Sequence, residues 1–199
     1  MSAEPRYTGF ELSVIREIAN IGTGNAATAL SQMVGRSVDI GTPIVELVPL
    51  AEAAERIGPL ETIVAAVLTP VSGDAPASLL LALPIESAAV LCSLLGTDAD
   101  SDLGRSCLQE IGNILTGAYT TAMATMTGLA IEPEPPLLAV DMLGAVVDAV
   151  LAMSVEASDT VLFLQTSIAI EGTACDFGFL FVPREGAVEN LLRALGLAA

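Results

Sequence analysis

The stretch EIANIGTGNAATAL (residues 17–30) recurs later in the chain as EIGNILTGAYTTAM (110–123). Eight of the fourteen aligned positions are identical, and the two copies lie 93 residues apart. At the same offset the match extends backwards, from Ser13 to Ser106. A long repeat at one fixed offset predicts two copies of one supersecondary unit, and therefore a pseudo-twofold molecule.

Each half of the chain also predicts the same order of elements. A long helical pattern is followed by an extended run, a short helix, two strand-like runs and a closing helix. The halves end alike, because LLLALPIESAAVLCSLLG (79–96) resembles GFLFVPREGAVENLLRALG (178–196). We expect a single domain over residues 1–199, made of two repeats at about 8–96 and 102–197.

Periodicity predicts the two long helices. Apolar residues recur at alternating spacings of three and four from about residue 10 to residue 34, which is typical of an amphipathic helix. The equivalent helix is expected over about 104–127, with Ser101 and Asp102 as N-cap candidates. A glycine stands just past each expected end, where a left-handed cap is common: Gly35 and Gly128.

Four apolar and β-branched runs predict strands, over residues 62–68, 78–83, 160–170 and 176–182. Turn residues at 72–76 and 171–172 suggest that these strands pair as hairpins. Helix, strand and hairpin patterns in this order predict an α+β fold, with two long site-bearing helices packed on a mainly antiparallel sheet.

The segment GTGNAA (22–27) has the spacing of a G-x-G-x-x-A dinucleotide-binding loop. Such a loop follows a strand and opens a helix, whereas this segment lies in the middle of an expected helix. The second copy reads LTGAYT (115–120) and lacks the first glycine. We therefore interpret Gly22 and Gly24 as small residues at which another helix or strand packs closely.

The chain carries a net charge of −17, with 24 acidic residues, seven Arg, no Lys and no His. This charge repels nucleic acid and anionic membranes, so we expect neither as a partner. Two explanations of the acidity stay open: solubility or adaptation to a salty cytoplasm on the one hand, and an acidic docking face for a basic partner on the other. The lack of His removes the commonest general base and the commonest zinc ligand, and we expect no metal site.

Cysteine usage and hydropathy predict a soluble cytoplasmic protein. Cys92, Cys107 and Cys175 show neither C-x-x-C spacing nor a neighbouring His, which is typical of reduced thiols in a cytosolic protein. The N-terminus lacks the basic-then-apolar order of a signal peptide. Acidic residues interrupt the most apolar runs, so no membrane span is expected.

Three polar residues line up on the first long helix. Ser13, Glu17 and Asn20 are spaced i, i+4 and i+7, which places them within about 60° of arc on one side of the helix. The second helix repeats this geometry with the same residue types: Ser106, Glu110 and Asn113. Glu and Asn persist while neighbouring positions differ between the copies, which favours a function over simple solvation.

Ser, Glu and Asn together suit a limited chemistry. An Asn amide can hold a water without taking its proton, and a Glu can pair with a cation on a partner. That suits an acyl phosphate, whose hydrolysis depends mainly on positioning and electrostatics. Ester or amide hydrolysis, by contrast, requires a nucleophile and a general base within reach of each other. A site on an exposed helix also favours a macromolecular substrate that brings its own active-site groups.

The full pattern, [DS]-x3-E-x2-N-x22-P, occurs twice and closes with Pro43 and Pro136. It resembles the motif of the CheC/CheX/FliY family of phosphatases, and the likeness covers nearly the whole chain. The resemblance implies that the substrate is the phosphoaspartate of CheY, the chemotaxis response regulator. It also implies that the chain has no cofactor of its own, because the receiver supplies the Mg²⁺.

The resemblance assigns a role to each motif residue. It implies that Asn20 and Asn113 orient the attacking water, in line with the phosphoaspartate. It implies that Glu17 and Glu110 anchor the receiver by pairing with its lysine.

The supporting positions are less defined by the same resemblance. Pro43 and Pro136 would shape the chain near the site, or simply punctuate a strand. Ser13 and Ser106 occupy a position where the family accepts Asp or Ser, and they would either contact the receiver or fill the helix surface.

Duplication within one chain favours the CheC branch of this family, and we expect a monomer. Members of that branch commonly bind the deamidase CheD through the short helix of the second half. The matching stretch is DMLGAVVDAVL (141–151), with Asp148 as a candidate contact, although core packing of this segment is the alternative. The competing functional hypothesis is a weakly catalytic adaptor that binds phospho-CheY and sequesters CheD.

Overall fold

The computed structural model describes residues 8–153, 160–171 and 173–197, and these form an α+β domain of helices packed on one sheet. The elements of the first half are α1 (Gly9–Val34), β1 (Val38–Ile40), β2 (Ile44–Pro49), α2 (Leu50–Ile57), β3 (Ile63–Gly73), β4 (Ala77–Pro84) and α3 (Ile85–Leu94). Those of the second half are α4 (Asp102–Thr127), β5 (Ile131–Pro133), β6 (Leu137–Met142), α5 (Leu143–Met153), β7 (Thr160–Ile170), β8 (Thr173–Pro183) and α6 (Ala187–Ala194).

The same order of elements occurs in both halves. Each half begins with a helix of 26 residues, continues with two short strands and a helix, and ends with two longer strands and a helix. This recurrence supports the duplication that the sequence predicts, while a common origin of the halves stays a prediction.

All pairings in the sheet are antiparallel, and the two halves share it. The order of the main path is β1-β7-β8-β4-β3-β5, with β2 also paired to β7 and β6 to β3. The hairpins β3–β4 and β7–β8 are those expected from the sequence, and they join edge to edge through β4 and β8. The short strands of each half pair with the hairpin of the other half. Neither half could therefore complete its own sheet alone.

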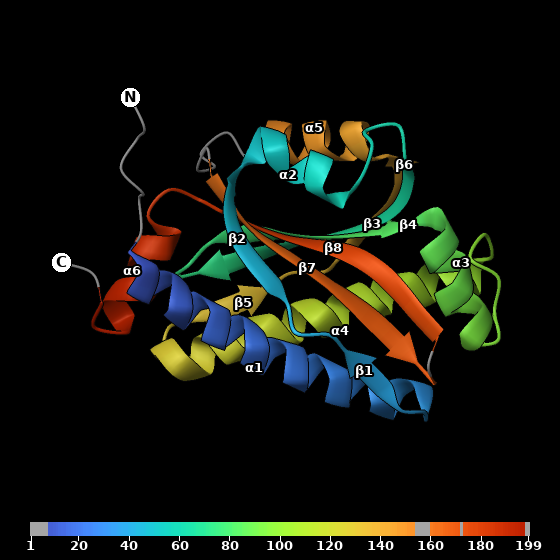
Figure 1. Cartoon of the computed structure of the whole chain (residues 1–199), viewed down its shortest axis with the longest axis horizontal. Helices are drawn as coiled ribbons and strands as arrows, with labels where there is room; N and C mark the ends of the chain where they lie inside the picture. Colours follow the sequence, from blue (N-terminus) through green and yellow to red (C-terminus); the bar gives the residue numbers. More distant parts are fainter. Residues whose placement is uncertain (1–7, 154–159, 172, 198–199) are drawn as a thin grey trace.

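Helices cover both faces of the sheet (Figure 1). The long helices α1 and α4 lie against one face, and α2 and α5 lie against the other. The alternating strand pattern feeds both layers, because successive side chains of a strand point to opposite faces. In β4, for example, Leu79 and Leu81 belong to the core under α1 and α4, whereas Leu80 and Ala82 belong to the core under α2 and α5.

The ends of the two long helices follow the expected caps. Thr8 caps α1 in a capping box with Glu11, and Ser101 caps α4 by accepting a hydrogen bond from the Gly104 amide. Both helices end at a left-handed glycine, with φ of 66° and 71° at Gly35 and Gly128. The sequence therefore predicted these boundaries to within two residues.

The segment 22–27 lies inside α1, so the interpretation of GTGNAA as helix rather than loop is confirmed. Gly22 is a close-packing site, because a Cβ there would lie 2.5 Å from Cδ1 of Tyr119 on α4. The same interpretation of Gly24 is wrong: it is exposed, and a Cβ there would meet nothing within 4 Å. A glycine pair two residues apart cannot place both members on the buried side of a helix.

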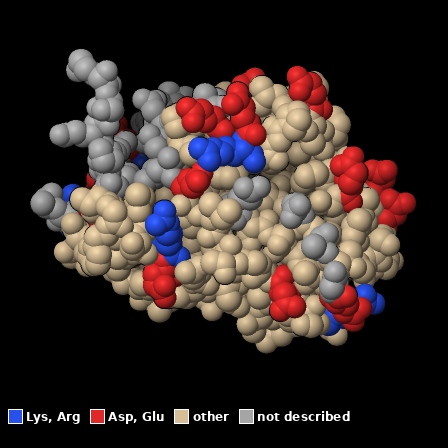
Figure 2. Space-filling model, in the orientation of Figure 1, with Lys and Arg blue, Asp and Glu red and all other residues tan. Residues whose placement is uncertain are grey.

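The charged side chains are spread over the face seen in Figure 2, with few Arg and wide uncharged areas between the acidic groups. Among the described residues, Arg56 forms an ion pair with Glu46 and Arg36 forms one with Glu171. No helix among the described residues is long and apolar enough to cross a membrane.

Candidate functional site

The first polar stripe lies on the outer face of α1. Ser13, Glu17 and Asn20 are all exposed, whereas Ile18 and Ala19 between them are buried against the sheet. Burial of the apolar side of α1 leaves its polar side facing solvent, as the spacing predicts.

The second stripe has the same arrangement on α4. Ser106, Glu110 and Asn113 are exposed, and Ile111 and Gly112 are buried. A Cβ at Gly112 would collide with the side chain of Val67 in β3. The close approach fixes the height of α4 above the sheet at the turn that carries Glu110 and Asn113.

The two stripes face solvent at different ends of the helix pair. The helices α1 and α4 pack side by side and run in opposite directions (Figure 1), so residues early in one lie beside residues late in the other. Both stripes occupy the N-terminal halves of their helices. The molecule therefore carries two separate polar surfaces of the same composition.

In both halves the serine hydroxyl donates to the carbonyl oxygen four residues earlier in its own helix. Ser13 Oγ donates to the Gly9 carbonyl oxygen and Ser106 Oγ donates to that of Asp102, each at 2.9 Å. These bonds stay within the helix, so the serine proton is already used. The remaining lone pairs of each hydroxyl still face solvent as acceptors.

The Glu and Asn side chains are open to a partner. Asn113 Nδ2 lies 3.5 Å from Glu110 Oε2, which is long for a hydrogen bond. Glu17 and Asn20 make no side-chain hydrogen bond to another described residue. The amide and carboxylate of each stripe are thus available to a water and to a cation brought from outside.

The motif proline of the second half lies beside its stripe. Gln109 Nε2 donates to the Pro136 carbonyl oxygen at 2.7 Å, which ties the connection between β5 and β6 to α4 next to Glu110. Sequence reasoning missed Gln109. Its counterpart at the offset of 93 is Arg16, so the internal comparison gave no signal there.

The motif proline of the first half is held differently. Pro43 is buried in the connection between β1 and β2. Its neighbour Gly41 is fixed to β7, because its carbonyl accepts from Thr166 Oγ1 at 2.7 Å and its amide donates to the Ser167 carbonyl at 3.0 Å. Both connections are therefore anchored, one to a strand and one to a site helix.

Asp148 lies apart from both stripes. It is exposed on α5, on the face of the sheet opposite to α1 and α4 (Figure 1). The inner side of α5 is buried through Val146, Val147 and Val150. The predicted amphipathic packing of this helix is thus confirmed, and Asp148 lies on its exposed side.

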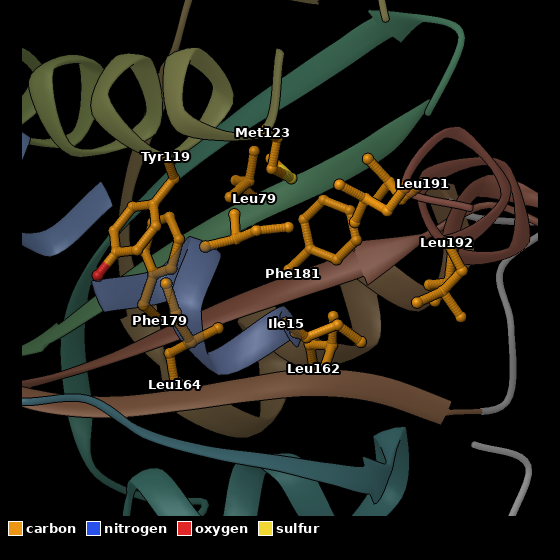
Figure 3. Close-up of a pocket in the computed structure, with 14 residues that line it drawn as sticks. Ile15, Leu79, Tyr119, Met123, Leu162, Leu164, Phe179, Phe181, Leu191 and Leu192 are labelled. Atoms are coloured by element: carbon orange, nitrogen blue, oxygen red, sulfur yellow. The ribbon is translucent and has the colours of Figure 1, made fainter. Parts of the chain in front are cut away.

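An apolar pocket with about 50 Å³ of free volume lies beneath α1, between α4, α6 and the sheet (Figure 3). Its lining includes Ile15, Leu164, Met123 and Leu191, and the one polar atom among the side chains is the Tyr119 hydroxyl. No titratable carboxylate or amide of the stripes enters it. Among the described residues, no group of three or more Cys, Asp or Glu is arranged to hold a metal ion. The Glu and Asn side chains of both stripes lie outside this pocket, on the exposed surfaces of α1 and α4.

The family model described as the CheC-like family matches residues 10–47 and 103–138, and the two segments contain both copies of the motif. A CheY-P phosphatase CheC from Bacillus subtilis (strain 168) is 30% identical over 196 residues, which cover 94% of each chain. The chain belongs to the CheC-like family.

Further relatives of this CheC-like chain agree in sequence and fold. The flagellar motor switch phosphatase FliY of Bacillus subtilis (strain 168) is 33% identical over 132 residues, which cover 63% of the CheC-like chain and 34% of FliY. The crystal structure of Thermotoga maritima FliY superposes with a TM-score of 0.75 at 21% identity, covering 96% and 98% of the two chains. The chemotaxis protein CheX of Desulfovibrio desulfuricans gives 0.52 at 16% identity, covering 84% and 99%. The structural matches show a shared fold.

Proposed function

We propose that the protein hydrolyses the phosphoaspartate of a CheY-type receiver. The observation that carries this proposal is the pair of exposed Glu–Asn stripes, one on each long helix, whose amide and carboxylate are free to engage a partner. Membership of a family that contains a named CheY-P phosphatase supports it.

In the proposed mechanism each Asn enters the active site of the docked receiver. The Asn20 or Asn113 carboxamide holds a water in line with the phosphorus, so that attack needs little reorganisation. An amide cannot take the proton, which suits a loose phosphoryl-transfer transition state with little need of a base. The receiver supplies Mg²⁺ as part of the substrate.

Each Glu holds the receiver in place. The exposed carboxylates of Glu17 and Glu110 would pair with the receiver's lysine, next to the phosphoryl group. Such a pair becomes partly desolvated on docking, which makes it stronger than an ordinary surface ion pair. Because the two stripes are separate, we propose that both sites act.

The test is the rate of phosphate loss from a Mg²⁺-loaded phospho-receiver. The four proteins compared are wild type, Asn20→Ala, Asn113→Ala and the double variant. We expect wild type to speed the loss, each single variant to retain the activity of one site, and the double variant to fall to the receiver's spontaneous rate. Asn25→Ala is the matched control, because Asn25 is exposed on α1 but lies about 140° around the helix from Asn20.

The second candidate function is an adaptor that binds phospho-CheY and sequesters CheD. The position of Asp148 favours it. Asp148 is exposed on α5, which covers the face of the sheet away from both stripes, so CheD and the receiver could bind at the same time. Wild type that binds the activated receiver without changing its rate of phosphate loss would support the adaptor. An Asp148→Arg variant should then lose CheD binding and keep receiver binding.

A further inference from the structure

The most exposed large apolar side chains of the described residues follow the repeat. The four most exposed large ones are Phe10 (66%), Leu103 (63%), Ile44 (57%) and Leu137 (55%). They form two pairs at the offset of 93 residues, which also relates the two site motifs. Unrelated surface hydrophobic residues would not be expected to coincide in this way.

Each of these residues lies next to motif residues. Phe10 and Leu103 precede the motif serines by three residues and the motif glutamates by seven, so each lies about 20° around its helix from the glutamate. Ile44 directly follows the motif Pro43, at the start of β2, which packs against α1.

The second half shows how closely the strand residue approaches the stripe. Leu137 follows Pro136, whose carbonyl oxygen is bonded to Gln109. Gln109 lies about 40° around α4 from Asn113, on the side away from Leu103. The polar stripe is thus bordered by an exposed apolar residue on each side.

Polar stripes alone are poor sources of affinity, because exposed charges gain little when they pair. Strong interfaces surround a polar centre with side chains that exclude water and bury apolar area. The hydration of an exposed phenylalanine or leucine is unfavourable, and docking would remove that surface from water.

We propose that Phe10 with Ile44, and Leu103 with Leu137, form apolar rims that bind the phosphorylated receiver around each polar stripe. The rims set the affinity for the receiver, whereas the Asn side chains set the rate. This inference rests on the proposed function for the identity of the partner.

The test isolates one site at a time in the full chain. In the Asn113→Ala background only the first site hydrolyses, and Phe10→Ala or Ile44→Ala should raise KM about tenfold and leave kcat unchanged. In the Asn20→Ala background the same effect should move to Leu103→Ala and Leu137→Ala. The same four substitutions should weaken binding of a receiver activated with beryllium fluoride and Mg²⁺.

Matched controls come from exposed apolar residues near α5, away from both stripes. Met142 ends β6, and Leu60 contacts Gly144 of α5, on the face of the sheet opposite to α1 and α4. Leu60→Ala and Met142→Ala should leave KM unchanged. The proposal is overturned if these controls raise KM as much as the rim variants do, or if the rim variants change kcat alone.

The outcomes separate this inference from the phosphatase proposal. If wild type binds the activated receiver without speeding hydrolysis, the phosphatase proposal is wrong. The rim proposal is then supported if the rim variants weaken binding. If wild type speeds hydrolysis while all four rim variants keep the wild-type KM, the rim proposal alone is wrong. If wild type neither binds the activated receiver nor speeds its dephosphorylation, both proposals are wrong.

Discussion

Tyr119 Oη and Thr23 Oγ1 lie 2.9 Å apart in the buried interface between α4 and α1. Thr23 Oγ1 also donates to the Ala19 carbonyl oxygen at 2.9 Å, so the tyrosine hydroxyl is the donor to the threonine. The Tyr119 ring stacks on Phe179 of β8, with 4.8 Å between the ring centroids. This chain of contacts joins the two site helices to each other and to the sheet.

The direction of that hydrogen bond predicts unequal effects of removing its ends. Thr23→Val leaves a buried tyrosine donor without an acceptor, which should lower the free energy of unfolding by about 1–3 kcal/mol. In Tyr119→Phe the Thr23 hydroxyl still donates to the Ala19 carbonyl oxygen, so the free energy of unfolding should fall by less, about 0.5–1.5 kcal/mol. Urea unfolding of both variants measures the difference. A larger loss in Tyr119→Phe would contradict the assigned donor.

The two glycines of GTGNAA should respond in opposite ways to alanine. Gly22→Ala forces a Cβ against the Tyr119 ring, and we expect a loss of about 1–3 kcal/mol in unfolding free energy. Gly24→Ala adds a methyl group in open space inside a helix and should gain about 0.5–1 kcal/mol. Thermal and urea unfolding provide the measurement. A gain at both positions would show that Tyr119 can move aside.

Thr69 in β3 offers a stabilising substitution. Its hydroxyl is fully buried and finds no hydrogen-bond partner among the described residues. Thr69→Val replaces the hydroxyl with a methyl group of similar shape and should raise the unfolding free energy by about 1 kcal/mol. Thr166→Val is the control, because Thr166 Oγ1 donates to the Gly41 carbonyl and its loss should destabilise. A destabilised Thr69→Val would point to a bonded hydroxyl instead.

Burial predicts a loss of stability in alkali. Desolvation raises the pKa of Tyr119 above its ordinary value, although Thr23 lowers that pKa in part, because its hydroxyl can turn and donate to the phenolate. The unfolded chain therefore releases the phenol proton first, so stability is intact below about pH 10 and falls as pH rises through the folded pKa. Unfolding measured against pH should show this fall in wild type and a smaller one in Tyr119→Phe. Equal slopes would exclude Tyr119 as the cause.

Gln109 should matter for the second site alone. Its bond to Pro136 holds the β5–β6 connection against α4, so Gln109→Ala should loosen the border of the second stripe. Misplacement of this kind can lower a rate by up to about 10²-fold. The measurement is phosphate loss in the Asn20→Ala background, where only the second site acts. An equal loss in the Asn113→Ala background would indicate a general structural defect.

The sequence predicted what local chemistry specifies. Caps at Ser101 and Gly128 set helix ends through bonds within a few residues, and the i, i+4, i+7 spacing alone put Glu17 and Asn20 on one exposed side. It could not predict partners distant in the chain. Nothing in the periodicity of β2 indicates that it pairs with β7, and nothing near Gln109 indicates that a proline carbonyl will reach it.

The exchange of short strands between the halves has a consequence for how the chain folds. Val38 of β1 pairs with Ile170 of β7, and Ile44 of β2 with Gln165. During synthesis the first half must leave the ribosome with these edges unpaired, and it can close them only when nearly the whole chain has emerged. Late closure of such distant pairings is slow. We therefore expect a nascent first half to be aggregation-prone, and the two sites to become competent together rather than in turn.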